Sequence, residues 1–526
     1  MPDGKKEQER AKLHHAIWSI ANSLRGSVDG WDFKQYVLGM LFYRYISEDF
    51  AEYINKLERE SKPSFDYASY HGDIDTETAK ELVSEKGFFI PPAELFENVR
   101  RSAPRDKDLN VTLTNVFKNI EASTRGTKSE TGFKGLFDDL DWSSKKLGDT
   151  LDERNKRLIK LMNGIGEMKL DITSCFSNGT IDAVGDAYEF LIGMYASNAG
   201  KSGGEFYTPQ EVSELLARIV LVGKTKVNKV YDPACGSGSL LLKFSKFLGK
   251  DKVKNGFFGQ EINLTTFNLC RMNMFLHGVG YDKFDIAHGD TLTKPQHESY
   301  EPFEAIVSNP PYALHWEGDG NPLLINDPRF APAGVLAPKS NADLAFVMHC
   351  LAWLATNGTA AILCFPGVMY RSGAEQKIRQ YLIDSNFVDC VIQLPDKMFY
   401  GTSIAVCVMV LKRSKPENST LFIDASREFV KVTKNNKLAP ENIKTILDAY
   451  MARKDVPYFA RLVHNEEVAE NKYNLSVSTY VEPEDKRQPV DIKELNAKLD
   501  EIVAREDKLR VEIAAIIAEI EGGEAA

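Results

Sequence analysis

The chain has 526 residues, of which 43% are hydrophobic and 27% are charged, and its formal net charge is −10. This length predicts two to four domains with substantial cores. An acidic chain does not offer the generally basic surface by which proteins grip duplex DNA unaided. Binding to DNA would therefore need a local basic patch or a basic partner.

Features of membrane, secreted and metal proteins are missing from the sequence. No apolar run reaches about 18 residues, and residues 1–12 are charged where a secretory signal would be apolar. We therefore expect a cytoplasmic protein without a membrane segment. The seven cysteines are scattered without close pairs, which argues against a disulfide framework and against a cysteine-rich metal site. We expect buried thiols and no bound metal.

Residues 1–180 are predicted to form an all-helical domain. Apolar residues recur at spacings of three and four between Leu13 and Leu24, which is typical of an amphipathic helix. The domain is rich in aromatic residues such as Tyr36, Phe42 and Tyr43. Because aromatic residues at helical spacing usually pack inside a domain, we expect them in a core rather than stacked on nucleobases.

Residues 181–415 are predicted to form an α/β domain with a seven-stranded, Rossmann-like sheet. The expected strands are residues 227–231, 256–259, 284–287, 303–307, 359–365, 387–394 and 404–411. Because helical stretches separate most of these runs, we expect a mostly parallel sheet with helices on both faces. The short connection before the seventh run predicts an antiparallel strand there. Ligands of such sheets bind beyond the carboxyl ends of strands, where the strand order reverses.

The end of the chain divides into two predicted parts. Residues 416–484 form a mixed extension with a strand-like run at residues 421–424, and residues 485–523 form an amphipathic helix. The apolar residues of this helix recur in nearly heptad fashion, at Ile492, Leu495, Leu499, Ile502, Leu509, Ile513, Ile516 and Ile520. Periodicity alone leaves open whether the helix packs on its own domain or on a partner.

The fourth expected strand ends in the sequence Asn309-Pro310-Pro311-Tyr312. Proline has a fixed φ and no backbone N–H, so the amide oxygen of Asn309 and the proline carbonyls are rigid acceptors beside the ring of Tyr312. Such a site suits a planar group that bears an amino group, because two acceptors take its hydrogens and leave the lone pair to attack. A strand-ending turn explains the same residues equally well, since Asn and Pro are common in turns.

The first three expected strands end in residues that suit an adenosine with a positively charged tail. Asp232 begins a glycine-containing loop, Glu261 follows the second strand and Asp290 follows the third. The glycines allow the backbone to approach a nucleotide-like ligand, although the loop matches neither a P-loop nor a complete dinucleotide fingerprint. The carboxylate of Asp232 favours a cation, Glu261 could bind ribose hydroxyls, and Asp290 could bind an adenine amino group. Each acid also fits a cap or strand end. If the first and fourth strands are neighbours, both loops open into one crevice.

A further polar segment precedes the α/β domain, with the sequence Lys-Ser-Gly-Gly-Glu-Phe-Tyr-Thr-Pro-Gln at residues 201–210. Thr208 and Glu211 have the spacing of a capping box, and Pro209 fits the first position of a helix. Capping does not explain why Phe206 and Tyr207 stand beside two glycines.

Three motifs occur in one order: Gly-Glu-Phe-Tyr-Thr-Pro, Asp-Pro-Ala-Cys-Gly-Ser-Gly and Asn-Pro-Pro-Tyr. They resemble those of S-adenosylmethionine-dependent methyltransferases that act on adenine N6 in DNA. The whole chain is similar to the modification subunit of type I restriction-modification systems. The resemblance implies catalytic roles for Asn309, Pro310 and Tyr312. It implies that S-adenosyl-L-methionine is bound by Glu205, Phe206, Tyr207, Thr208, Pro209, Gln210, Asp232, Gly236, Ser237, Gly238, Ser239, Glu261 and Asp290.

The resemblance also implies an assembly. Its expected partners are DNA, a specificity subunit that reads the target sequence and contacts the C-terminal helix, a second modification subunit and a restriction subunit. The target adenine would have to be flipped out of the duplex. The long, proline-containing segment between Tyr312 and Asn341 is expected to cover or order around that base.

Three other functions stay open at this point. They are a standalone DNA adenine methyltransferase, a protein glutamine methyltransferase and a scaffold without chemistry. The Gly-Glu-Phe-Tyr-Thr-Pro motif and the helical regions argue against the glutamine methyltransferase, and the intact Asn309, Pro310 and Tyr312 argue against the scaffold.

Overall fold

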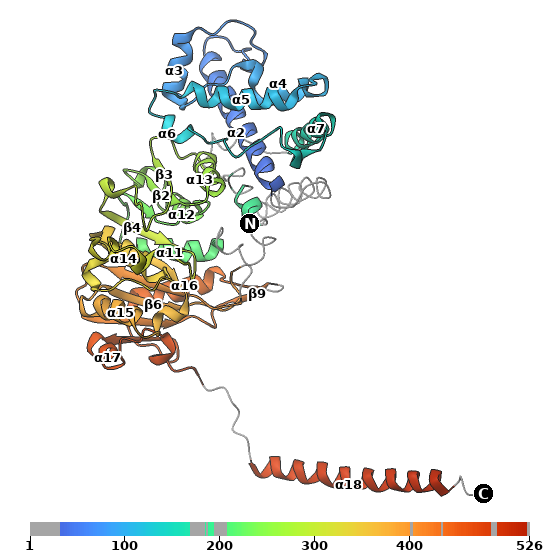
Figure 1. Cartoon of the computed structure of the whole chain (residues 1–526), viewed down its shortest axis with the longest axis vertical. Coiled ribbons are helices and arrows are strands. Elements are labelled where there is room, and N and C mark those ends of the chain that lie inside the picture. The colour runs from blue at the N-terminus through green and yellow to red at the C-terminus, as the bar shows by residue number, and fades with distance from the viewer. Residues whose placement is uncertain are drawn as a thin grey trace. The chain divides into compact units, whose positions relative to one another are not determined.

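The computed structural model describes residues 32–168, 185, 188–193, 208–399, 403–432, 435–484 and 492–522. Two compact units make up the chain, Met1–Val481 and Glu482–Ala526. The first holds a helical domain and an α/β domain, and the second contains the single helix α18 (Ile492–Gly522) (Figure 1). Within the described ranges, no helix is both long and apolar enough to cross a membrane.

The helical domain is built around a core rich in aromatic rings. Its longer helices are α2 (Asp32–Glu58), α3 (Thr76–Lys86), α4 (Phe96–Ser102), α5 (Leu109–Ser123) and α7 (Leu151–Glu167). Tyr36, Phe42 and Tyr43 are buried in this core, and Tyr36 packs on Trp142 with ring centroids 5.4 Å apart. The expectation that these aromatic residues pack inside the domain is confirmed.

The helical domain is held against the α/β domain through α13 (Leu264–Leu276). The amide Nδ2 of Asn268 donates to Oδ1 of Asp139 at 2.9 Å. The buried guanidinium of Arg271 donates to backbone carbonyls in and after α6 (Glu130–Phe133), the shortest of these bonds being 2.8 Å. Because these polar groups are buried together with apolar residues of α13, the two domains share one continuous interface.

The α/β domain contains one mixed sheet of nine strands in the order β11-β8-β6-β7-β5-β4-β1-β2-β3. Its strands are β1 (Val230–Asp232), β2 (Phe257–Glu261), β3 (Phe284–His288), β4 (Phe303–Ser308), β5 (Leu354–Cys364), β6 (Val388–Gln393), β7 (Cys407–Lys412), β8 (Ser419–Asp424) and β11 (Ala460–His464). All seven expected strands are present, and β7 runs antiparallel to β5 and β6 as predicted.

The expected count of seven strands was too low. Strand β8 is parallel to β6, and β11 is antiparallel to β8, so the sheet continues beyond residue 415. The apolar run in β8 was visible in the sequence, whereas β11 reads Ala-Arg-Leu-Val-His. An edge strand that is only half buried needs no continuous apolar run, and its sequence signal is correspondingly weak.

Helices cover both faces of the sheet. One face packs against α11 (Gln210–Leu221), α12 (Ser239–Leu248), α13 and α16 (Pro440–Ala452), and the other against α14 (Asp343–Trp353), α15 (Ala374–Asp384) and α17 (Asn465–Glu470). Successive residues of a strand pack in the hydrophobic cores on opposite faces of the sheet, as Val230 and Tyr231 do. Burial on both faces explains why the strands read as continuous apolar runs.

The strand order places the expected ligand crevice between β1 and β4. These strands are neighbours and parallel, and β2 lies on the other side of β1. The order of the strands therefore reverses at β1, and the loops that follow β1 and β4 leave the same edge of the sheet, which is where ligands bind in folds of this kind.

Candidate active site

Asn309 lies directly after β4 with its side-chain amide held from both sides. The hydroxyl of Tyr312 donates to Oδ1 of Asn309 at 2.7 Å, and Nδ2 of Asn309 donates to Oγ1 of Thr208 at 3.1 Å. Asn309 is only 8% exposed. Burial raises the pKa of Tyr312 well above its ordinary value, so the phenol keeps its proton and can donate it. These contacts go beyond what a strand-ending turn requires.

The prediction of a capping box at Thr208 is wrong. Helix α11 begins at Gln210 with Pro209 as its N-cap, and no side chain caps it. The hydroxyl of Thr208 is buried and accepts from Asn309 instead. In place of the expected local contact, Thr208 therefore makes a tertiary one. Glu205, Phe206 and Tyr207 lie outside the described residues, and their part in cofactor binding stays a prediction.

Asp232 ends β1 with a fully buried carboxyl group. Its Oδ1 accepts from the backbone N–H of Ala234 at 3.0 Å, whereas Oδ2 has no hydrogen-bond partner in the described parts of the chain. Burial raises the pKa of Asp232 from 3.8 to about 7, and the nearby carboxylate of Glu261 adds to this shift. A buried carboxyl with one unsatisfied oxygen would be stabilised by a cationic ligand.

The loop after β1 needs its glycines for backbone geometry. Gly236 and Gly238 have φ values of +54° and +80°, a region that residues with a Cβ rarely adopt. A Cβ on Gly238 would also lie 2.8 Å from Sγ of Cys270 in α13. Beside them, the hydroxyls of Ser237 and Ser239 are 3.2 Å apart and buried. The loop therefore stays close to the sheet edge, where a ligand can reach its backbone.

Glu261 connects the ends of β1 and β2. Its Oε2 accepts from the N–H of Gly236 at 3.1 Å, and its Oε1 accepts from the N–H of Asn263 at 2.8 Å. Burial raises the pKa of Glu261. Each carboxylate oxygen can accept a second hydrogen bond, so these contacts position the group and leave it acceptor capacity for a ligand hydroxyl.

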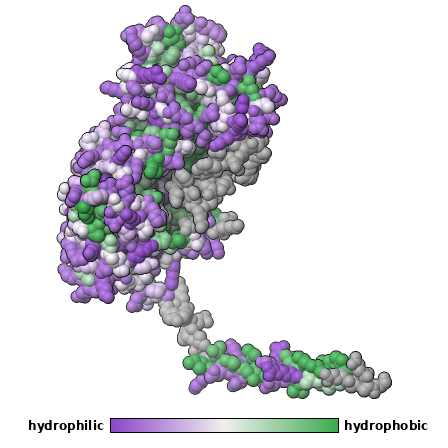
Figure 2. Space-filling model, in the orientation of Figure 1, coloured by the Kyte–Doolittle hydropathy of each residue, from purple (hydrophilic) through white to green (hydrophobic). Residues whose placement is uncertain are grey.

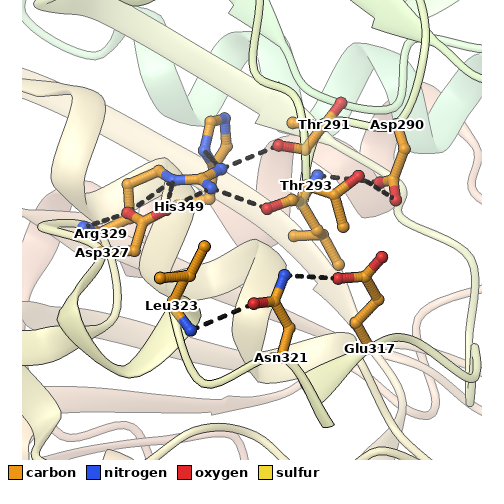
Figure 3. A network of polar contacts seen from close by, with 10 residues as sticks. Asp290, Thr291, Thr293, Glu317, Asn321, Leu323, Asp327, Arg329 and His349 are labelled. Atoms are coloured by element: carbon orange, nitrogen blue, oxygen red, sulfur yellow. Dashed lines mark hydrogen bonds and ion pairs between the residues drawn. The ribbon is translucent and has the colours of Figure 1, made fainter. Parts of the chain in front are cut away.

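Asp290 is used locally in the structure. Its Oδ1 accepts from the N–H of Leu292 at 2.9 Å, and its Oδ2 accepts from the hydroxyl of Thr293 at 2.8 Å (Figure 3). These bonds form a turn at the end of β3, which fits the strand-end interpretation, and no helix begins at Asp290. The loop that it shapes follows β3, which β1 and β2 separate from β4 in the sheet.

Gln210, the last of the expected cofactor residues before β1, opens α11. Its Oε1 accepts from the ammonium of Lys243 in α12, and Lys243 is buried. This contact joins the start of α11 to α12, which begins directly after Gly238. Thr208 and the glycine loop are thus held on adjacent packed helices.

Arg329 connects the segment after β4 to the loop after β3. This contact was not predicted from the sequence. It lies in the segment between Tyr312 and α14. Its Nη1 donates to the carbonyl of Thr291 at 2.8 Å, and its Nη2 donates to the carbonyl of Leu292 at 2.7 Å and to Asp327 at 2.7 Å (Figure 3). The segment after β4 is therefore tied to the loop that Asp290 begins.

Three further bonds extend this network into the core. The hydroxyl of Thr291 donates to the carbonyl of Pro233 in the loop after β1, at 2.5 Å. Nη1 of Arg329 lies 3.2 Å from Nδ1 of His349, whose Nε2 lies 2.9 Å from the hydroxyl of Tyr231. Burial and Arg329 lower the pKa of His349 well below its ordinary value. Because arginine can only donate, Nδ1 accepts and Nε2 of the neutral ring carries the proton.

The described residues contain no group of three or more His, Cys, Asp or Glu side chains placed to hold a metal ion. The six cysteines in the described ranges are buried and free.

Comparison with known proteins identifies the family. The N-6 DNA Methylase family model matches residues 179–489, and the HsdM N-terminal domain model matches residues 13–165. The methylase subunit of the type I restriction enzyme MpnII from Mycoplasma pneumoniae is 49% identical over 532 residues, which cover 98% of this chain and 97% of that protein. The chain belongs to the methylase subunits of type I restriction enzymes.

Two solved structures resemble the chain. The methyltransferase subunit of a type I restriction-modification system from Streptococcus thermophilus is 35% identical and superimposes with a TM-score of 0.81, covering 90% of this chain and all of that one. A chain from a structure of complex assembly in a type I system has the same fold, with a TM-score of 0.61 at 18% identity over 98% of this chain and 99% of that one. The predicted methyltransferase fold and modification-subunit family are both confirmed.

Proposed function

We propose that this methylase subunit transfers a methyl group from S-adenosylmethionine to N6 of an adenine that has been flipped out of DNA. The observation that carries the proposal is the Asn309 amide. It is fixed at the carboxyl end of β4 by Thr208 and Tyr312, and it stands at the switch point beside the Asp232 loop.

The residues around the end of β1 fit the cofactor. The unsatisfied Oδ2 of Asp232 suits its cationic tail, Glu261 has acceptor capacity for ribose hydroxyls, and Asp290 stands at the adenine end. The loop of residues 236–239 and Thr208, Pro209 and Gln210 would complete the site. When bound, S-adenosylmethionine supplies an electrophilic methyl group on a sulfonium. The protein contributes orientation and a water-excluding environment.

On the DNA side, Asn309 and Pro310 would accept the two N6 hydrogens of the adenine. Accepting both hydrogens directs the nitrogen lone pair away from the protein acceptors. The hydroxyl of Tyr312 takes one of the two lone pairs of Oδ1 of Asn309, and we expect the base to displace this bond. Tyr312 would then stack on the base, which offsets part of the few kcal/mol that flipping costs.

Helix α18 supports a role within an assembly. Its apolar side chains are exposed along the helix, among them Leu495, Leu499, Ile502 and Ile516 at 50–64%, and Figure 2 shows hydrophobic residues over its length. A helix with such a stripe is usually buried against other helices. We propose that α18 packs against the specificity subunit, which would read the target sequence. We also expect a second methylase subunit and a restriction subunit in the complex. Because the substrate is DNA, we place the assembly in the cytoplasm.

The proposal is tested on the native complex. The chain is purified with its partners from the host, and methylated bases are identified in host DNA before and after deletion and complementation. N6-methyladenine should appear with the wild-type chain and disappear with Asn309→Ala. Asn357→Ala, an exposed amide that donates to Glu304 at the opposite edge of the sheet, serves as the matched control and should restore full methylation.

The alternatives predict other results. Methyl transfer into glutamine of a protein, and never into DNA, would establish the protein methyltransferase. Sequence-specific DNA methylation by the purified chain without partners would establish a standalone enzyme. Full methylation by the Asn309→Ala complex would remove the proposed mechanism.

A further inference from the structure

A small β-hairpin projects from the edge of the sheet at which the site opens. It consists of β9 (Val430–Val432) and β10 (Asn435–Lys437), which pair antiparallel as a separate two-stranded sheet (Figure 1). The hairpin follows β8, which is parallel to β6. Since β6, β5 and β4 run in the same direction, the hairpin leaves the sheet at the edge where Asn309 follows β4.

Hydrogen bonds and one charge interaction place the base of the hairpin near the start of α11. The backbone N–H of Asn436 donates to the carbonyl of Lys397 at 3.0 Å, and its side chain donates to Asp396. Burial raises the pKa of Glu211 in the first turn of α11, and the ammonium of Lys437 is near enough to offset part of that rise. Helix α11 begins two residues after Thr208, which binds Asn309. The hairpin therefore stands next to the proposed base site.

The hairpin is basic and exposed in a chain whose net charge is −10. Residues 427–437 contain four basic residues, Arg427, Lys431, Lys434 and Lys437, and one acid, Glu428. Glu428 accepts from Asn442 at 3.0 Å, on the side of α16. All three residues of β9 are exposed, including Val430 and Val432. A hairpin that served only packing would bury one of its two faces.

We propose that the hairpin β9–β10 is a surface for duplex DNA, on which Lys431 and Lys437 contact backbone phosphates next to the flipped base. The inference rests on the proposed function, because it requires that DNA enters the crevice beside Asn309. Lysine ammonium groups neutralise phosphates and release counterions, which provides affinity without reading sequence. The hairpin thus supplies the local basic patch that an acidic DNA-modifying chain needs, at the place where the duplex must pass.

The test compares two doubly substituted chains in the assembled complex. One carries Lys431→Ala with Lys437→Ala, and the control carries Lys226→Ala with Lys252→Ala, two exposed lysines that precede β1 and β2 at the opposite edge of the sheet. The Kd for a duplex that contains the target site is measured between about 50 and 200 mM salt. The hairpin variant should bind on the order of 10- to 100-fold more weakly near 100 mM, and its salt slope should fall by about two.

Further readouts separate this role from a structural one. The thermal midpoint and the subunit composition of the hairpin variant should equal those of the control, and Lys431→Arg with Lys437→Arg should restore affinity and slope. A hairpin variant with the Kd and salt slope of the control would overturn the proposal, even if methylation fell. Failure of the proposed function would show differently, as DNA without N6-methyladenine in the wild-type complex.

Discussion

The side-chain amide of Asn309 donates to Oγ1 of Thr208 at 3.1 Å, joining two sequence motifs that lie 101 residues apart. This bond engages the nitrogen end of the amide, so the oxygen end faces Tyr312 and the proposed position of the base. If the amide were turned the other way, its N–H2 group would face the N–H2 group of the adenine. Two donors would then meet, and the hydrogens of the adenine would have no acceptor. Thr208 and Tyr312 together therefore hold the amide with its oxygen available as an acceptor.

Replacing Thr208 by valine should slow methyl transfer without abolishing assembly. The substitution keeps the shape of the side chain and removes one hydrogen bond, which contributes about 1 kcal/mol. We expect a single-turnover rate about tenfold lower in the native complex, measured at saturating DNA and cofactor. Thr208→Ser restores the hydroxyl and should retain most of the rate. An unchanged rate in the valine variant would show that the bond does not orient Asn309.

Tyr312 is expected to respond differently to loss of its hydroxyl and loss of its ring. The hydroxyl competes with the substrate for Oδ1 of Asn309, so Tyr312→Phe should bind target DNA at least as tightly as wild type. Tyr312→Ala loses stacking of about 1–3 kcal/mol per base and should bind on the order of 10- to 100-fold more weakly. Fluorescence of 2-aminopurine at the target position reports the flipped base directly. Weaker flipping in the Phe variant would mean that the hydroxyl serves the substrate rather than Asn309.

Much of the α/β domain was readable from the sequence because its strands are buried on both faces. Continuous apolar runs such as residues 303–307 mark these strands, and their alternation with helices predicted that the loops after β1 and β4 would meet. Strand β11 was not predicted, because this edge strand contains Arg461 and His464 and so has no continuous apolar run. The hairpin β9–β10 was not predicted either, because the exposed residues of β9 give no apolar pattern in the sequence.

The polar contacts of the site were harder to predict. Thr208 carried a correct local signal for a helix start, but a partner 101 residues away uses its hydroxyl. Arg329 lies in a proline-containing segment without periodicity. Its role is visible only from the carbonyl groups that it contacts in the folded chain. Local propensity reports neighbours within about four residues along the chain. Contacts between separate loops depend on the topology that brings those loops together.

Arg329 should position the cofactor side of the site through its planar guanidinium. It is 6% exposed and bonds two backbone carbonyls and Asp327 at once. Lysine keeps the charge but not this geometry. We expect Arg329→Lys to weaken cofactor binding about tenfold and to speed proteolysis between Tyr312 and Asn341. Lys339→Met removes an exposed pair with Asp319 in the same segment and serves as the control. Equal proteolysis rates for the two variants would contradict the assignment.

Asp232 should make cofactor binding depend on pH. Its pKa is raised to about 7, so below pH 7 the carboxyl must lose a proton before it can pair with a cation. The Kd for S-adenosylmethionine, measured by calorimetry from pH 5.5 to 8.5, should rise about tenfold per pH unit below 7 and level off above it. The raised pKa also affects the stability of the ligand-free protein. Between about pH 3.9 and 7 the folded state binds more protons than the unfolded state, so the contribution of Asp232 to stability falls as the pH rises. Above about pH 7 this contribution stays unfavourable. Asp232→Asn should bind weakly at every pH and lack both trends. A wild-type pH profile in this variant would assign the titration to another group.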